Sequence, residues 1–192
     1  MSVLENPFER EQKEYYLLSS KWAELQPNAL LAEPQVIKEL DLATCTIEDS
    51  KGIHIDDEFS SFDFDIDGGD EDYDGAPVSG FAGWFTSHFK SRTDEDGINA
   101  PKLNSPALLN TGPEAGYTHW GQQVFHLLSS ITLLQNETLR IRGSLELMRT
   151  KENARLYNCR IKFKTSRRKS GEPKNGDILM ESKEQEYVYQ IP

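Results

Sequence analysis

Residues 139–147 read Leu-Arg-Ile-Arg-Gly-Ser-Leu-Glu-Leu, an alternation of apolar and polar side chains that decides the fold. Because successive side chains of a strand point to opposite faces, this alternation predicts a strand with one buried face. The same period recurs at Tyr157, Cys159, Ile161 and Phe163, and a last strand is expected near residues 184–191. Gln-Asn-Glu at residues 135–137 supplies the turn before the first of these strands. The C-terminal half is therefore predicted to be an antiparallel sheet.

Aromatic residues extend the β pattern upstream. Phe81, Phe85 and Phe89 lie on one face, and Gly80 and Gly83 interrupt the stretch where a barrel strand would bend or bulge. We expect a mainly β protein whose residues 34–192 form one antiparallel, barrel-like domain.

The N-terminal segment has the signals of a helix. Asn6, Pro7 and Glu9 provide an N-cap, a proline at the first helical position and an early acid. Within about a 100° arc at helical spacing lie five apolar residues, namely Phe8, Tyr15, Leu18, Trp22 and Leu25. Pro27 is expected to end this helix, so residues 1–33 are predicted to be a helical arm inserted at the start of the barrel. From the residues alone, the stripe fits packing onto the chain's own barrel.

Charge is concentrated in one segment of the 192 residues. Residues 56–74 hold ten acidic and no basic residues. The rest of the chain has 21 basic and 22 acidic residues and thus a net charge of -1, so this one segment supplies nearly all of the total net charge of -11. We interpret residues 56–76 as an acidic loop insert, and we expect no nucleic-acid partner. Arg167, Arg168 and Lys169 are predicted to lie in a solvated turn.

Composition limits the class of protein. With 36% hydrophobic and 10% aromatic residues the chain is predicted to fold, and its two cysteines lack metal-type spacing. There is no leader-like N-terminus and no apolar run long enough for a bilayer, so no membrane partner is expected. We expect a cytoplasmic or nuclear protein.

One motif stands apart from this pattern. Residues 117–125 read Tyr-Thr-His-Trp-Gly-Gln-Gln-Val-Phe, and on composition alone a His beside a Trp is more often a packed pair than a site. With residues 7–22, 36–41, 80–85 and 148–156, this stretch resembles the C-terminal β-barrel and dimerisation arm of the protein arginine N-methyltransferases. The Gly-Gln-Gln continuation is most similar to the plant branch of that family.

The resemblance implies methyl transfer from S-adenosyl-L-methionine to arginine in protein substrates. It implies that His119 and Trp120 are catalytic, and that Thr118, His119 and Trp120 together contact the substrate. His119 would pair with an acid of the cofactor domain, Trp120 would wall the arginine pocket and Thr118 would fix the loop. The five apolar arm residues would dock on a partner subunit, giving a homodimer or a pairing with a full-length relative.

Other features argue against a second site in this chain. No GxGxxG-like turn follows a strand, so we expect no Rossmann domain, no cofactor bound by this chain alone and no turnover by it alone. The first half of a calcium-binding loop is matched by Asp63, Asp65, Asp67 and Gly68. The second half lacks the residues that such a loop requires, so no metal site is expected.

Two interpretations of the chain stay open. Met1 aligns with an internal methionine of the family's arm, which favours a portion of a longer methyltransferase. The alternative is a non-catalytic interaction protein that docks on a full-length arginine methyltransferase and regulates it.

Overall fold

The computed structural model describes Glu11, Tyr15 and residues 17–55, 57, 60–69, 77–89, 107–153 and 155–191. Within them the chain forms ten strands and three short 3-10 turns. The strands are β1 (Lys21–Ala23), β2 (Ser61–Asp67), β3 (Val78–Gly83), β4 (Thr86–Phe89), β5 (Ala107–Asn110), β6 (Gln122–Ile131), β7 (Glu137–Arg149), β8 (Tyr157–Lys169), β9 (Met180–Glu181) and β10 (Gln185–Ile191). The turns are η1 (Pro27–Ala29), η2 (Asp49–Lys51) and η4 (Pro113–Ala115).

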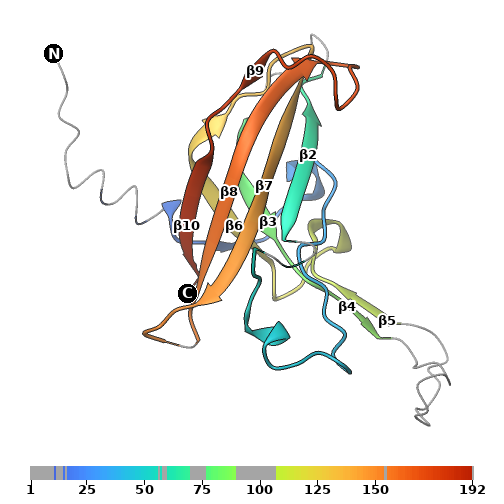
Figure 1. The fold of residues 1–192 in the computed structure, drawn as a ribbon. Helices are drawn as coiled ribbons and strands as arrows, with labels where there is room; N and C mark the ends of the chain where they lie inside the picture. Colours follow the sequence, from blue (N-terminus) through green and yellow to red (C-terminus); the bar gives the residue numbers. More distant parts are fainter. Residues whose placement is uncertain are drawn as a thin grey trace.

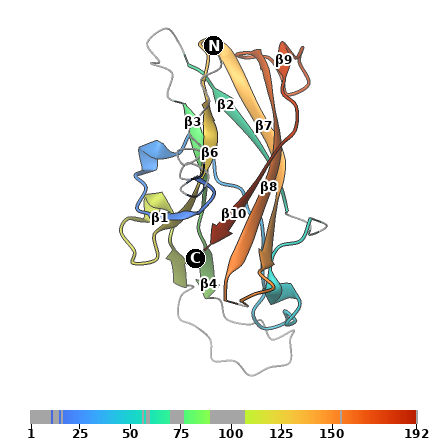
Figure 2. The ribbon, with the colours of Figure 1, turned by 90° about the vertical axis from the view of Figure 1, so that its left-hand side faces the viewer.

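The strands form two facing layers and a hairpin. One sheet has the order β10-β8-β7-β2 with β9 added beside β8, and the other has the order β1-β6-β3. Figure 1 shows the first sheet in front of the second, and Figure 2, turned by 90°, shows the two sheets side by side, with the β4–β5 hairpin at one end. Every pairing between these strands is antiparallel, which confirms the predicted mainly β, antiparallel class.

The two sheets are joined differently at their two sides. On one side Ser20 N–H donates to the Gln190 carbonyl and Gln190 N–H donates to the Leu18 carbonyl, both at 2.9 Å. On the other side the Gln35 side chain bonds both backbone groups of Asp63, at 2.7 and 2.9 Å. An amide side chain thus occupies the edge of β2 where a closed barrel would have a neighbouring strand. The domain is barrel-like but not closed.

The core lies between the layers and is built by the predicted alternation. Leu139, Ile141, Cys159, Ile161 and Phe163 are each only 1% exposed. Burial also raises the pKa of the Cys159 thiol to about 12, because the thiolate would lie in an apolar interior. The strands predicted from residues 139–147 and 157–163 are confirmed.

The helical arm is not formed as predicted. Glu11, Tyr15 and Leu17 have helical backbone, whereas Phe8 lies outside the described residues. The correction concerns Trp22 and Leu25, because Lys21–Ala23 is a strand that pairs with β6 and Leu25 follows it in irregular structure. Backbone hydrogen bonds to β6 and β10 prevail over helical spacing here, since tertiary context overrides a local pattern.

The acidic segment also needs correction, because residues 61–67 form strand β2 and are not part of a loop insert. Phe62 and Ile66 are buried between its acids. Arg140 binds Asp63 through both carboxylate oxygens at 2.7 and 2.6 Å, and Arg168 binds Asp65 at 2.8 Å. Arg168 lies in β8 and is only 8% exposed, so the solvated turn predicted for residues 167–169 is wrong.

Tight turns limit the strands of the larger sheet. At the end of β2, Gly68 N–H donates to the Glu137 carbonyl at 2.8 Å, and a Cβ at Gly68 would overlap the Leu134 carbonyl. Asn136 has a φ of 58° in the predicted turn before β7.

In β3 of the smaller sheet the register shifts between Val78 and Gly80, where the glycine predicted a bulge. Among the described residues, no helix has the length and apolar content needed to span a bilayer.

Candidate functional site

The Thr-His-Trp motif forms a tight turn that leads into β6. It follows η4 and Gly116, whose φ is 82°, and it ends at Gly121, whose φ is 52°. Gly121 N–H donates to the Thr118 carbonyl at 3.1 Å and closes the turn. Because a left-handed residue lies at each end, the chain reverses sharply and presents His119 and Trp120 to solvent.

Strand β1 holds the base of this turn. The Trp22 indole N–H donates to the Trp120 carbonyl at 2.6 Å. A Cβ at Gly121 would lie 2.6 Å from the Trp22 ring and 2.7 Å from the Ala23 carbonyl, so only a glycine allows this approach. Trp22 and Trp120 are therefore linked across 98 positions of sequence.

A buried glutamine holds the same turn from the other side. Gln122, only 4% exposed, accepts a hydrogen bond from Leu25 N–H at 2.7 Å and donates one to the Thr111 carbonyl at 2.8 Å. The Thr111 hydroxyl in turn donates to the Phe85 carbonyl at 2.9 Å, and Thr111 is fully buried. Since the buried side chains of Gln122 and Thr111 are both hydrogen-bonded to other segments, they fix the base of the turn.

The outward side of the turn is aromatic and polar. The His119 and Trp120 rings lie 3.9 Å apart at an interplanar angle of 30°, and the Phe85 ring meets Trp120 edge-on at 5.8 Å. Trp120 nevertheless stays 46% exposed. The buried Thr118 hydroxyl has no hydrogen-bond partner among the described residues. The turn therefore presents an aromatic face and an imidazole side by side, with the Thr118 hydroxyl buried behind them.

Such a surface suits a flat cation. An aromatic face attracts a guanidinium through its quadrupole, and tryptophan does so most strongly. An imidazole can accept or donate a proton near neutral pH and can pair with a carboxylate. A carboxylate is not part of this turn, so bidentate binding of a guanidinium needs acidic groups from elsewhere.

The structure places the predicted site residues in two groups. Thr118, His119 and Trp120 are adjacent, as the motif requires. Trp22 and Leu25, predicted for the dimerisation face, instead bond the base of the turn. Trp22 is 54% exposed and Tyr15 is 70% exposed, so both keep accessible surface. The dimerisation role of these residues stays a prediction.

Sequence reasoning missed Gln122, Thr111 and Phe85 as supports of the turn. Gln122 was visible only as part of the Gly-Gln-Gln continuation, and a buried glutamine cannot be told from an exposed one by local pattern. Thr111 and Phe85 are brought to the turn by the β4–β5 hairpin, which pairs Thr86 with Asn110.

Two acids of strand β2 are paired with arginines. In the described part of the chain, no three His, Cys, Asp or Glu side chains are grouped to hold a metal ion. The hydrogen bond from Arg140 lowers the pKa of Asp63. Burial works to raise the pKa of Asp65, but the hydrogen bond and charge of Arg168 outweigh it and the pKa is lowered. Both carboxylates are therefore committed to arginine.

Comparison with known proteins assigns the chain to a family. A family model described as "Arginine methyltransferase oligomerization subdomain" matches residues 6–168. The chain belongs to that family. Protein arginine N-methyltransferase PRMT10 of Arabidopsis thaliana is 31% identical over 178 residues, covering 91% of this chain and 41% of the relative. PRMT10 of Oryza sativa subsp. japonica is 28% identical over 163 residues, covering 85% of this chain and 38% of the relative.

Solved structures agree with the family assignment. Arabidopsis thaliana protein arginine methyltransferase 10, solved in an open conformation, has a TM-score of 0.66 at 26% identity, covering 99% of this chain and 47% of that chain. The Trypanosoma brucei PRMT1 enzyme-prozyme heterotetramer with AdoHcy has a TM-score of 0.60 at 14% identity, covering 97% of this chain and 46% of that chain, and shares the fold. The plant resemblance is confirmed, and the chain spans about two fifths of the length of these plant relatives.

Proposed function

We propose that this domain forms the substrate side of an arginine methyltransferase active site, with Thr118, His119 and Trp120 lining the pocket for the substrate guanidinium. The observation that carries the proposal is the anchored turn, which leaves the adjacent His119 and Trp120 rings accessible while Trp22 and Gln122 hold its base. A rigid support is what a binding surface needs, because positioning is lost when its supporting groups move.

The roles of the three residues follow from their chemistry. Trp120 covers one face of the guanidinium, which is always protonated. His119 pairs with an acidic side chain of the cofactor-binding domain and so helps to orient the groups around the guanidinium. Thr118 fixes the loop at its first position, where its carbonyl accepts the hydrogen bond from Gly121 N–H at 3.1 Å.

The methyl donor is assigned to another domain in this proposal. The described residues contain no Gly-rich turn between a strand and a helix, so they do not fit S-adenosyl-L-methionine. That cofactor supplies the methyl group when it is bound. The contribution of this chain is to wall the pocket, exclude water and bring subunits together, as the oligomerization subdomain of the family description suggests.

A chimeric enzyme tests this proposal. The cofactor-binding domain of Arabidopsis PRMT10 is joined to this chain in place of its own barrel, and methyl transfer to an arginine peptide is measured. We expect activity, and we expect His119→Ala to lower kcat at least about tenfold, in line with the loss of one positioned polar group, with an unchanged melting temperature. His54→Ala is the matched control, since His54 is also exposed but lies outside the turn.

The competing function predicts a different result. A regulator would leave the chimera inactive, while the separate chain would bind full-length Arabidopsis PRMT10 and change its rate. Equal losses of activity and stability in the His119→Ala chimera would also count against the proposed role of this residue.

A further inference from the structure

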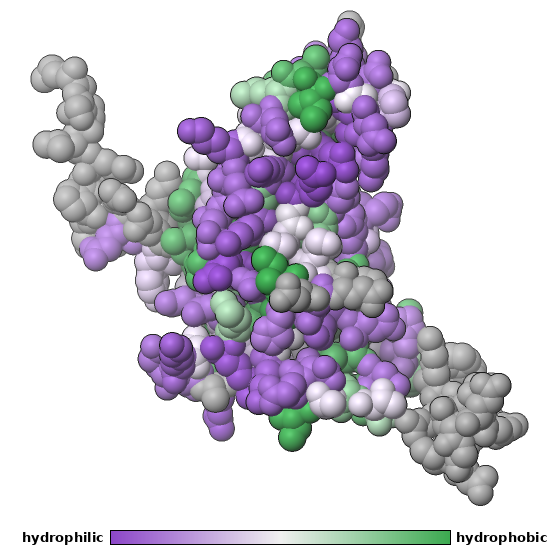
Figure 3. Space-filling model, in the orientation of Figure 1, coloured by the Kyte–Doolittle hydropathy of each residue, from purple (hydrophilic) through white to green (hydrophobic). Residues whose placement is uncertain are grey.

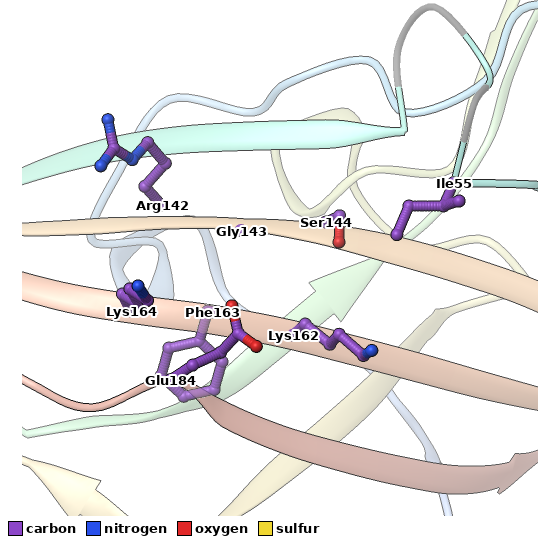
Figure 4. Close-up of a pocket in the computed structure, with 8 residues that line it drawn as sticks. All are labelled: Ile55, Arg142, Gly143, Ser144, Lys162, Phe163, Lys164 and Glu184. Atoms are coloured by element: carbon purple, nitrogen blue, oxygen red, sulfur yellow. The ribbon is translucent and has the colours of Figure 1, made fainter.

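The outer face of the larger sheet carries a hollow, and none of the residues of the Thr-His-Trp turn lines it. Its volume is about 460 Å³, and it lies over the middle of β7 and β8 (Figure 4). Arg142 and Ser144 of β7 and Lys162 and Lys164 of β8 line it, with Ile55 and Glu184 also lining it. The surrounding face is largely hydrophilic (Figure 3).

The basic residues of this hollow stand in an unfavourable arrangement. Arg142 lies directly opposite Lys164, and Ser144 lies opposite Lys162. Like charges placed opposite each other on neighbouring strands destabilise a sheet. Three cations in a chain of net charge -11 are thus gathered where they repel one another.

Neighbouring cations on the sheet are paired with acids, which singles out Arg142 and Lys164. Arg160 has Glu146 at 3.0 Å, Arg168 has Asp65 at 2.8 Å, and Lys162 of the hollow has Glu186 at 3.7 Å. Among the described residues, neither Arg142 nor Lys164 has a carboxylate at ion-pair distance. Asp63, opposite Arg142, is already bound by Arg140 through both oxygens. The Arg142 guanidinium and the Lys164 ammonium group therefore remain available to an incoming anion.

We propose that this hollow, formed by Arg142, Ser144, Lys162 and Lys164, binds the phosphate of a phosphorylated protein side chain. A compact dianion can take charge-assisted hydrogen bonds from two or three cations and the Ser144 hydroxyl at once. Ile55, 49% exposed beside them, offers apolar contact to the residue next to the phosphate.

The flanks of the hollow disfavour extended polyanions. Asp63 and Asp65 lie on β2 at one side, and Glu186 lies on β10 at the other. These carboxylates are paired with Arg140, Arg168 and Arg160, so a nucleic-acid strand or an anionic membrane would find few further unpaired cations beside the hollow. A single phosphate on a peptide needs only the cations of the hollow.

The test is a titration of the 192-residue chain, labelled with ¹⁵N, with a short phosphoserine peptide, its unphosphorylated twin and inorganic phosphate. We expect saturable shifts of the amides of residues 142–144 and 162–164 with the phosphopeptide and none with the twin. Arg142→Gln with Lys164→Gln should weaken binding at least about tenfold. Glu184→Gln should tighten it, because a carboxylate is removed from the hollow.

A matched variant separates local from overall charge. Lys151→Gln with Arg155→Gln removes the same charge from exposed positions between β7 and β8 and should change binding less than twofold. Equal weakening by both double variants, or no saturation, would overturn the proposal. Inorganic phosphate binding as tightly as the phosphopeptide would reject a peptide ligand, and tighter binding of a single-stranded RNA of equal charge would reject a phosphoprotein.

Discussion

Gly121→Ala should destabilise this domain by about 3 kcal/mol, because two costs add at one position. A left-handed backbone costs a residue with a Cβ about 1–2 kcal/mol, and Gly121 has a φ of 52°. The new Cβ would also lie 2.6 Å from the Trp22 ring and 2.7 Å from the Ala23 carbonyl. Overpacking of this kind costs about 1–3 kcal/mol.

Urea unfolding measures this effect. With an m-value of about 2.5 kcal/mol per M for a chain of this size, the midpoint should fall by about 1 M. Gly171→Ala is the control, since Gly171 has a φ of 82° but nothing within 4 Å of its Cβ position, and its midpoint should fall by less than half as much. In a Trp22→Ala background, Gly121→Ala should cost about 1 kcal/mol less, as a double-mutant cycle would show. Equal shifts for the two glycine variants would refute the close approach of β1 to the turn.

Three further predictions concern the sheet and its core. Asp65→Asn should cost about 1–2 kcal/mol at pH 7 by removing the charge that Arg168 binds. Because folding lowers the pKa of Asp65, this carboxylate contributes to the free energy of unfolding above about pH 4, and the contribution is lost as the pH falls. The stability of the variant should therefore change less with pH in acid, and an unchanged acid-unfolding profile would contradict the ion pair. Ile141→Ala should lower the free energy of unfolding by about 2–5 kcal/mol in a denaturant titration, since Ile141 is 1% exposed, and a loss below 1 kcal/mol would contradict its place in the core. A thiol reagent at pH 8 should modify only Cys45 in the folded protein, because burial raises the pKa of Cys159 to about 12, and two equivalents of reaction would refute that burial.

Local periodicity predicted the strands whose apolar and polar residues alternate without interruption. β7 and β8 belong to this class, and their buried faces carry the residues that the alternation indicated, whereas β10 was expected only by its position near residues 184–191. The acidic strand β2 has the same period, but its charges suggested a solvated loop. Arg140 and Arg168, which neutralise it, lie 77 and 103 positions from their partner acids, so no local pattern reveals the pairing.

The candidate site was predicted in its exposed part and not in its supports. Thr118, His119 and Trp120 form a recognisable motif. Trp22 was placed on a helix because its spacing from Leu18 and Leu25 fits a helical turn, whereas β6 draws Lys21–Ala23 into a sheet. The structural roles of Gln122 and Thr111 arise only when the β4–β5 hairpin and β1 meet at the turn.

The close approach at the end of β2 has a consequence for how the sheet is aligned. β2 reads Ser-Phe-Asp-Phe-Asp-Ile-Asp, so sliding it by two residues along β7 would keep every ring inward and every acid outward. Such a slide would bring residue 66 or residue 70, each with a side chain, to the place of Gly68 against the Leu134 carbonyl. Because only a residue without a Cβ fits at this place, Gly68 fixes the register of a strand whose repeating sequence would otherwise allow several alignments.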